Sequence, residues 1–329
     1  MALSADRGRE TLAGRRVLVT GAAGFIGSHL VRRLTQIGAR VTALARPESD
    51  LWRLADVASD VQLVRRDVSD FGEGPLVAAL DDIEFILHLA AAGVNPSAQA
   101  SSAMARTNIM GTLAVMQAAE RVGAARVVYC GSCSEYGSAT SVRENAALAP
   151  LSEYGASKAA GWMVARAASR RSGIPMVALR PFAVFGPYEG AQRLIPDAIL
   201  RALDGSEMRF TAGTQLRDFV YVDDAVDAFL LAITAPDIGG DSLNVCTGIA
   251  TPVRDVIETI VELSGRGSVP CFKGRSSRAD EPPAITGDPS RAEATLGWRA
   301  KTPLREGLES TMSWLRERAA EFPEYRRAR

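Results

Sequence analysis

The chain has 329 residues, of which 47% are hydrophobic and 23% charged, so it has the composition of a globular protein and the length for one large or two modest domains. Its formal net charge is zero, which gives no electrostatic reason to expect a nucleic acid or an anionic membrane as a partner. No apolar run approaches a membrane span, and the N-terminus lacks the apolar core of a signal peptide. We therefore expect a cytoplasmic protein.

A short β-branched run, Arg16–Thr20, is followed at once by three glycines and then by helical periodicity over Ser28–Leu34. Strand, glycine turn and helix in this order are typical of a dinucleotide-binding site, where the turn approaches the pyrophosphate and the helix N-terminus offers free N–H groups. The residues predicted to contact the cofactor here are Gly21, Gly24, Phe25, Ile26 and Gly27.

Arg46 follows the second predicted strand, Arg40–Ala45, at the position where an acidic residue would hold the ribose of NAD. A guanidinium suits a 2′-phosphate, and Ser49 and Arg53 are close enough in sequence to assist. The sequence therefore favours NADP(H), with NAD(H) possible. The alternative is that Arg46 stacks on the adenine and that the cofactor is NAD.

Four further apolar runs alternate with two long helices. The strands are Val61–Val64, Ile83–Ala90, Arg126–Cys130 and Met176–Arg180, and the helices are Met104–Ala124 and Glu153–Arg171. This alternation predicts a doubly wound, Rossmann-like parallel sheet in an α/β protein. Further residues predicted to line the cofactor are Asp67, Val68, Leu89, Ala90, Ala91 and Asn108.

The pattern changes after Pro181, where a loop rich in glycine, proline and aromatic residues (Phe182–Gly190) is followed by short strands and helices. We expect residues 1–181 to form the cofactor-binding domain and residues 182–329 a smaller, intercalated C-terminal α/β domain for the substrate. Segments such as 215–250 are expected to return to the first domain. A polar, proline-bearing stretch over 275–287 is predicted to be a loop.

Tyr154 and Lys158 lie four residues apart in the second long helix, and i,i+4 places them on one face. A nearby ammonium favours phenolate, so we expect Lys158 to lower the pKa of Tyr154 and to make it a general acid/base. The alternative is an incidental pair on a solvated helix face.

Cys130 and Cys133 form a C-x-x-C pair at the end of a predicted strand. Such a pair is found in redox dithiols and as half of a zinc site. There is no second pair, and the only histidines, His29 and His88, are far away in sequence. We therefore predict no metal site and favour two small side chains at a strand end.

Together these motifs resemble the extended short-chain dehydrogenase/reductase family, in its nucleotide-sugar epimerase/dehydratase/reductase branch. The resemblance spans nearly the whole chain and rests on TGAAGFIGSHL, HLAA, TNIMGT, the serine loop before Tyr136-Gly137, YGASK, LRPFAVFGP, RDFVYVDD and LGW. It implies that Ser132 and Tyr154 contact one sugar oxygen and that Lys158 holds the nicotinamide ribose. It also implies a homodimer through helices 104–124 and 153–171.

The same resemblance implies how a nucleotide-diphosphate sugar binds: Arg217 and Arg278 contact the diphosphate, and Arg193 lies near the base. Cys133 and Ser134 are expected beside the sugar. Two departures from the family pattern stand out.

The first departure is Ala183, which stands where the family usually has an asparagine that touches the substrate phosphate. The second is that Cys133 and Ser134 replace the acidic pair of the dehydratases, and Glu135 comes one residue later. A thiol and a hydroxyl are poor substitutes for an acid and a base in water elimination, so a 4,6-dehydratase is disfavoured.

From these features we expect an oxidoreductase that uses NADPH to reduce a ring ketone of a nucleotide-diphosphate keto-deoxy sugar, a 4-ketoreductase of carbohydrate biosynthesis. The alternative is a 4-epimerase that retains NAD and uses the same Ser132, Tyr154 and Lys158. A non-catalytic cofactor-binding protein is less favoured, because Tyr154 and Lys158 are both present.

Overall fold

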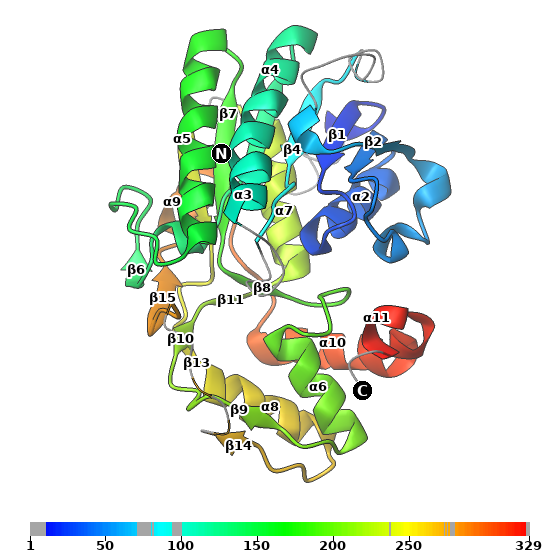
Figure 1. Cartoon of the computed structure of the whole chain (residues 1–329), viewed down its shortest axis with the longest axis vertical. Coiled ribbons are helices and arrows are strands. Elements are labelled where there is room, and N and C mark those ends of the chain that lie inside the picture. Colours follow the sequence, from blue (N-terminus) through cyan, green and yellow to red (C-terminus); the bar gives the residue numbers. More distant parts are fainter. Residues whose placement is uncertain are drawn as a thin grey trace.

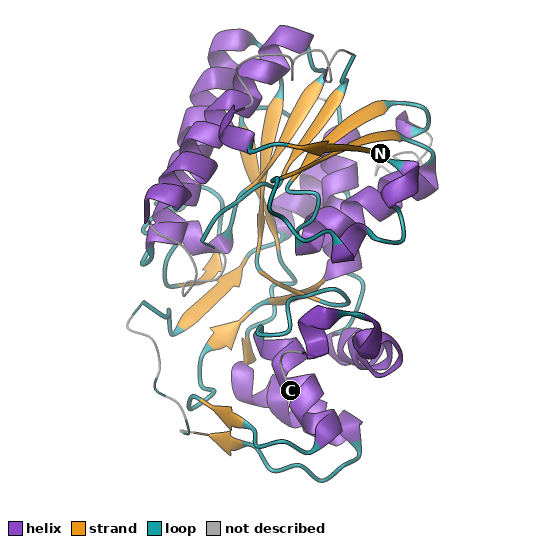
Figure 2. Ribbon diagram, turned by 45° about the vertical axis from the view of Figure 1, so that its right-hand side comes forward, coloured by secondary structure: helices purple, strands orange, loops and turns teal. Residues whose placement is uncertain are grey.

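The computed structural model describes residues 11–70, 80, 82–93, 101–236, 238–272, 274, 276 and 280–326. Its centre is a seven-stranded sheet with helices on both faces (Figures 1 and 2). All neighbouring strands are parallel, in the order β12-β7-β5-β4-β1-β2-β3, which confirms the predicted Rossmann-like sheet. The strands are β1 (Arg16–Thr20), β2 (Arg40–Ala45), β3 (Gln62–Arg65), β4 (Phe85–His88), β5 (Arg126–Cys130), β7 (Met176–Pro181) and β12 (Asp241–Val245).

Helices α2 (Phe25–Ile37) and α7 (Val222–Thr234) pack together on one face of the sheet. Helices α4 (Thr112–Val122) and α5 (Glu153–Ser172) pack together on the other. Most of α7 is buried, because the sheet covers one side of it and α2 and α9 (Ser290–Leu296) cover others. The strand order reverses between β1 and β4, so their carboxyl ends open a crevice where a ligand can bind.

The predicted helix Met104–Ala124 is not uniform. It consists of α3 (Ser101–Met104), a π-helical segment over Ala105–Gly111, and α4. The wider turn has a packing partner in α5, since a Cβ atom on Gly161 would lie 2.4 Å from the Asn108 carbonyl oxygen. Hydrophobic periodicity does not report such a local widening, so the sequence predicted a plain helix.

The second part of the molecule holds a four-stranded sheet and two strand pairs. The sheet is β13 (Thr251–Pro252), β10 (Leu216–Arg217), β15 (Ala284–Gly287) and β6 (Ala139–Val142); the pairs are β11 (Phe219–Tyr221) with β8 (Ala183–Phe185), and β14 (Cys271–Phe272) with β9 (Arg209–Phe210). The helices are α6 (Leu194–Asp204), α8 (Val253–Ser264), α10 (Leu304–Arg318) and α11 (Pro323–Arg326). Strands β8 and β15 lie within stretches predicted to be loops, so those two predictions were wrong.

The two parts exchange segments. Strand β12 and helix α7 pack with the large sheet, whereas β6, which lies between β5 and α5 in sequence, pairs with β15 of the smaller sheet. We propose a domain boundary near Pro181 that the chain crosses more than once. In the described part of the chain, no helix is both long and apolar enough to cross a membrane.

Candidate active site at the carboxyl edge of the sheet

The Ser132 hydroxyl lies close enough to Tyr154 to lower the pKa of its phenol. Ser132 follows β5, and Tyr154 lies in the first turn of α5, where the Ser152 hydroxyl caps the helix by accepting from the Gly155 N–H at 3.1 Å. The Ser134 N–H donates to Ser132 Oγ at 3.1 Å. Since the Ser132 oxygen already accepts this bond, its own proton is available to donate to a second oxygen beside Tyr154.

Burial raises the pKa of Tyr154 above its ordinary value, and the neighbouring Cys130 thiol adds to the effect, while the nearby Ser132 hydroxyl opposes it. The expected lowering by Lys158 was therefore wrong for the protein in this structure. Lys158 is 2% exposed, and burial lowers the pKa of its ammonium. Tyr154 is a protonated phenol at neutral pH.

The glycine turn has the close approaches that a dinucleotide site requires. A Cβ atom on Gly21, which has a φ of 67°, would lie 2.7 Å from the Ala90 backbone nitrogen. One on Gly27 would lie 2.2 Å from the Gly21 carbonyl oxygen. Gly24 precedes α2 without a side-chain cap, so the N–H groups of the first turn, including those of Phe25 and Ile26, face the crevice unsatisfied by a cap. This geometry fits a pyrophosphate.

Asn108 was predicted to touch the cofactor, but its side chain is used within the protein. Its Oδ1 accepts from the Ala92 N–H at 2.8 Å, and its Nδ2 donates to the Ala92 carbonyl at 3.0 Å and to Ser157 Oγ at 2.8 Å. Asn108 therefore joins the loop after β4 to α5. Its effect on a ligand is through the position of Ala92, which is a correction to the predicted contact.

His88 is fully buried between two threonines, and its tautomer follows from them. Thr112 Oγ1 donates to the Asn108 carbonyl at 2.7 Å, so it must accept from His88 Nε2, 3.0 Å away. His88 Nδ1 is then the acceptor for the Thr20 hydroxyl at 2.7 Å. Burial, with a contribution from Lys158, lowers the pKa of His88 to about 3. The neutral ring thus cross-links β1, β4 and α4 beneath the site.

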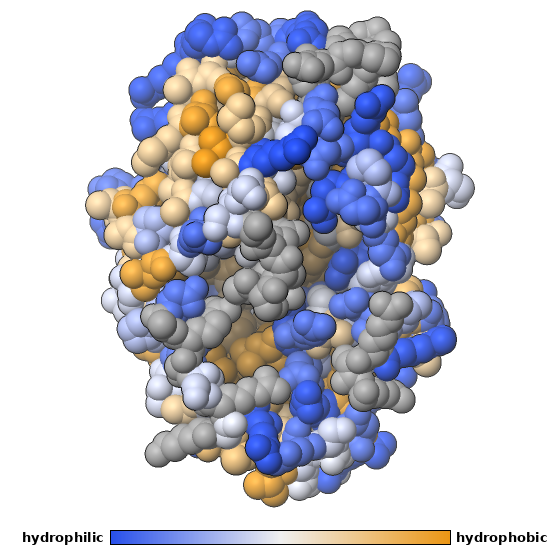
Figure 3. All heavy atoms as spheres, viewed as in Figure 1, coloured by the Kyte–Doolittle hydropathy of each residue, from blue (hydrophilic) through white to orange (hydrophobic). Residues whose placement is uncertain are grey.

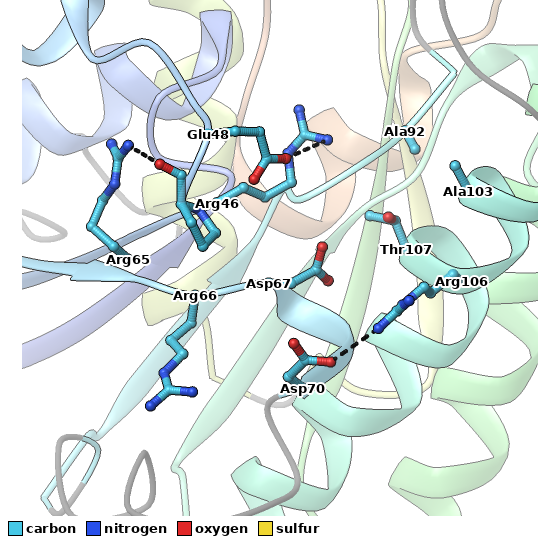
Figure 4. Close-up of a pocket in the computed structure, with 11 residues that line it drawn as sticks. Arg46, Glu48, Arg65, Arg66, Asp67, Asp70, Ala92, Ala103, Arg106 and Thr107 are labelled. Atoms are coloured by element: carbon cyan, nitrogen blue, oxygen red, sulfur yellow. Dashed lines mark hydrogen bonds and ion pairs between the residues drawn. The ribbon is translucent and has the colours of Figure 1, made fainter.

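A cavity of about 590 Å³ lies beyond the ends of β2 and β3 (Figure 4). We name it the arginine-lined cavity; its residues include Arg46, Glu48, Arg65, Arg66, Asp67, Asp70, Ala92, Arg106 and Thr107. Arg46 pairs with Glu48 at 3.3 Å, and Arg66 points away from that pair (Figure 4). Asp67 accepts from the backbone and hydroxyl of Ser69, and these bonds outweigh burial, so the pKa of Asp67 is lowered.

Arg53, which the sequence suggested as an aid to Arg46, is not among the residues that line this cavity. Its Nε donates to the Tyr188 carbonyl at 2.8 Å, and its Nη1 lies 3.5 Å from the Ala23 carbonyl of the glycine turn. The guanidinium also stacks over Trp52, 4.3 Å from the ring centroid. Arg53 therefore ties the glycine turn to the loop after β8. Nothing in its local sequence distinguishes this role from that of a surface arginine.

A sequence model of the NAD dependent epimerase/dehydratase family matches residues 17–246, which span the glycine turn, Ser132, Tyr154 and Lys158. The chain belongs to this family. Members are NAD-dependent extended short-chain dehydrogenases/reductases that act on nucleotide sugars, as the resemblance of its motifs implied.

Several relatives match the chain over nearly their full length. It is 32% identical to a UDP-glucose 4-epimerase of Mycolicibacterium smegmatis, over 92% of this chain and 99% of that one. The structure of MoeE5 in complex with UDP-glucuronic acid and NAD is 37% identical, with a TM-score of 0.82 and coverage of 92% and 99%. A dTDP-glucose 4,6-dehydratase of Streptomyces venezuelae, DesIV, with NAD and TYD bound, is 29% identical, with a TM-score of 0.86 and coverage of 94% and 99%.

The two cysteines of the C-x-x-C pair, Cys130 and Cys133, are free thiols in this protein. Burial raises the pKa of Cys130 to about 11 and that of Cys133 to about 12, although Arg217 opposes the second shift. Both remain protonated at neutral pH, so neither is an activated nucleophile or a general base.

Glu135, the acid that follows them, turns away from the crevice. It is fully buried, and its Oε2 accepts from Arg180 Nε at 2.7 Å. Its Oε1 accepts from the Ser132 N–H at 2.8 Å. A carboxylate held by these two donors is not placed to exchange protons with a sugar. The sequence left the direction of this side chain open.

The arginines predicted to grip the substrate come from separate elements. Arg217, on β10, has a side chain 16% exposed and pairs with Glu281 at 3.2 Å. The neighbouring Asp218 is buried and accepts from the backbone of Thr247 and Gly248, which fixes this strand. Arg193 precedes α6, with a side chain 53% exposed and 3.7 Å from Glu189. Arg278 lies outside the described residues.

Proposed function

We propose that this protein is a UDP-sugar 4-epimerase that retains NAD. When bound, the nicotinamide supplies the acceptor and later the donor of a hydride. Tyr154 takes the proton from the 4-hydroxyl during oxidation and returns it during reduction, and the Ser132 hydroxyl donates to the same oxygen. Lys158, buried behind them, binds the ribose of the cofactor. The 4-hydroxyl is oxidised to a ketone and the ketone is reduced again in the same site, so there is no net consumption of cofactor.

The observation that carries this proposal is the contrast between two neighbouring groups. The Ser132 hydroxyl lies near the Tyr154 phenol, while the nearest carboxylate in sequence, that of Glu135, is paired with Arg180. Epimerisation at one carbon needs one proton-transfer group, whereas loss of water needs a further acid and base. The similarity to a UDP-glucose 4-epimerase and to MoeE5 with UDP-glucuronic acid and NAD supports the same choice.

The test is incubation of the purified protein with UDP-glucose, UDP-galactose and UDP-glucuronic acid without added cofactor. We expect one of them to reach equilibrium with its 4-epimer, and NAD to be released when the protein is denatured. Tyr154→Phe should keep the bound NAD and lose conversion. If no sugar is epimerised, while NADPH is consumed with a UDP-4-keto-6-deoxy sugar, the protein is a reductase instead.

That reductase is the second candidate, because β2 ends without the acid that would hold the ribose of NAD and Arg46 stands there instead. A cofactor that is consumed in each turnover is more often NADPH. Glu48 argues the other way, since its carboxylate pairs with Arg46 and would repel a 2′-phosphate. We therefore place NAD first and NADP(H) second.

For the substrate, we propose that Arg217 exchanges Glu281 for the diphosphate. The positive charge of Arg217 acts to lower the pKa of the Cys133 thiol, which lies in the loop that carries Ser132. Arg193 and Arg278 are proposed as further contacts to the nucleotide, and Cys133 and Ser134 as walls of the sugar site. Arg217→Gln should raise KM for the nucleotide sugar far more than it lowers kcat, because the diphosphate contact is the same in ground and transition states.

We also propose a homodimer through α4, α5 and the π-helical segment. Met110 and Met163 project from this surface with exposures of 57% and 58%, and apolar residues gather over α4 and α5 in Figure 3. Light scattering should give a mass of twice 35.0 kDa. Met163→Glu should then yield monomers, and a mass of 35.0 kDa for the unmodified chain would remove the proposal.

A further inference from the structure

The Glu135–Arg180 ion pair is the most deeply buried pair of opposite charges in the described part of the chain, with side-chain exposures of 0% and 2%. A buried ion pair is weak support for stability, because desolvation of both charges offsets their attraction. The carboxylate of this pair is shared between the guanidinium and the backbone of Ser132.

We propose that Glu135 is a positioning residue for Ser132, held in place by Arg180, and that it sets the direction of the Ser132 hydroxyl. The inference rests on the proposed function, since it needs Ser132 to act on the substrate oxygen. Glu135 acts on Ser132 through the backbone, and Ser132 acts on the reacting oxygen.

The geometry of the loop supports this assignment. Glu135 Oε1 accepts from the Ser132 N–H, and Ser132 Oγ in return accepts from the Ser134 N–H, so the two side chains close a reciprocal capping box around one turn. The box fixes the Ser132 oxygen as the acceptor for the Ser134 N–H, which leaves the hydroxyl proton free for another oxygen. Gly131 leaves the room for it, because a Cβ atom there would lie 2.7 Å from Glu135 Oε1.

Arg180 is in turn fixed on its other side. Its Nη1 donates to Tyr136 Oη and to Ser242 Oγ, each at 2.9 Å. Tyr136 donates to Asn244 Oδ1 at 2.8 Å. These partners come from β7, β12 and the Ser132 loop, so the network connects the position of the serine to the rigid edge of the large sheet.

Single substitutions of Glu135 would leave Arg180 buried without its partner, and such a chain can fail to fold. The informative variants change both residues. Glu135→Met/Arg180→Met replaces the pair with apolar side chains and removes the acceptor for the Ser132 N–H. Glu135→Gln/Arg180→Gln keeps a carbonyl oxygen that can accept from Ser132 and an amide that can bond to position 180. Glu144→Gln is the matched control, since Glu144 accepts from the Asn244 N–H in the same network without touching Ser132.

The measurement is kcat and KM for the epimerisation, with thermal unfolding of each variant. We expect the Met/Met variant to lose about 10-fold to 100-fold in kcat at nearly unchanged KM, as misplacement of one reacting group does. The Gln/Gln variant and Glu144→Gln should stay within about 3-fold of the parent, since each leaves Ser132 an acceptor.

The decisive comparison repeats the Met/Met change in a Ser132→Ala background. Because Glu135 acts through the Ser132 hydroxyl, the change should then have no further effect on kcat. The inference is overturned if Met/Met keeps the parent kcat, or if its loss is equally large without the hydroxyl. Failure of the proposed function looks different, since the unmodified protein itself would then not epimerise any UDP-sugar.

Discussion

Lys158 and Tyr129 make two contacts with each other, one through the lysine ammonium and one through its backbone carbonyl. The Lys158 ammonium lies over the Tyr129 ring, 4.5 Å from its centroid, and the Tyr129 hydroxyl donates to the Lys158 backbone carbonyl at 2.9 Å. The ring of β5 thus supports the buried cation of α5 from below. Tyr154, one turn earlier in α5, lies beside the loop that carries Ser132 instead.

This arrangement predicts different outcomes for two substitutions of Tyr129. Tyr129→Phe keeps the ring beneath the ammonium and should cost about 1 kcal/mol of unfolding free energy for the lost hydrogen bond. Tyr129→Leu removes the ring and should lower the affinity for NAD, because Lys158 is no longer held in place. Urea unfolding and NAD titration measure the two effects, and equal NAD affinity in both variants would contradict the support by the ring.

The proton chemistry should follow the raised pKa of Tyr154. Oxidation of the sugar needs the phenol to lose its proton, and burial makes that loss harder at neutral pH. We expect kcat to rise with pH between 7 and 10. Tyr154→Phe should abolish the rise together with about 100-fold or more of the rate. A rate that is flat over this range in the parent protein would show that the bound complex has a much lower phenol pKa.

Acid should destabilise the fold through its two histidines. Burial lowers the pKa of His88 to about 3 and that of His29 to about 4, so each contributes stability that is present above pH 6.5 and lost as the pH falls toward those values. Each histidine should cost about 1.4 kcal/mol per pH unit below 6.5. Urea unfolding between pH 7 and 5 measures the slope, and His29→Gln should halve it. An unchanged stability at pH 5 is the contrary result.

Cofactor choice should depend on the balance between Arg46 and Glu48. Both side chains are largely exposed, so their pairing is weak and easily exchanged for a ligand. Glu48→Gln removes the charge that repels a 2′-phosphate and should raise the affinity for NADP relative to NAD by about 10-fold. Glu258→Gln, which alters an equally exposed pair with Arg254, is the control. Fluorescence titration with both cofactors gives the ratio, which stays constant if Glu48 has no part in it.

Arg53 should contribute to stability through the two loops that it joins. Arg53→Met removes both the donor to the Tyr188 carbonyl and the guanidinium that lies over Trp52, so we expect a loss of about 1–3 kcal/mol. Arg40→Met, at an exposed position on β2, should change stability by less than about 0.5 kcal/mol. Thermal unfolding compares the two. Equal effects would mean that the bond across the loops is not a net stabilising contact.

The sheet, the glycine turn and the long helix that carries Tyr154 could be predicted from local pattern. Each is a buried run or an amphipathic segment with a clear boundary, such as Ser152 before α5. Strands β8 and β15 could not, since each is only three or four residues long and pairs with a strand far away in sequence. Short strands of this kind depend on tertiary partners rather than on their own composition.

In the site, residue types were predictable and environments were not. The i,i+4 spacing of Tyr154 and Lys158 placed them on one helix face, but the pKa of a phenol depends on how much protein covers it. Likewise, the sequence named Glu135 as an acid near the site without showing that Arg180, 45 residues later, occupies it. For Asn108, the sequence did not show that Ala92 and Ser157, which lie in other elements, would bind its side chain.

The position of β12 at the edge of the large sheet has a consequence for synthesis of the protein. Residues 241–245 pair with β7, so the cofactor-binding sheet stays one strand short until the ribosome has made about three quarters of the chain. Until then β7 has an open edge. A nascent chain paused before Asp241 should therefore be a substrate for chaperones and should not bind NAD, although every residue of the glycine turn has already been translated.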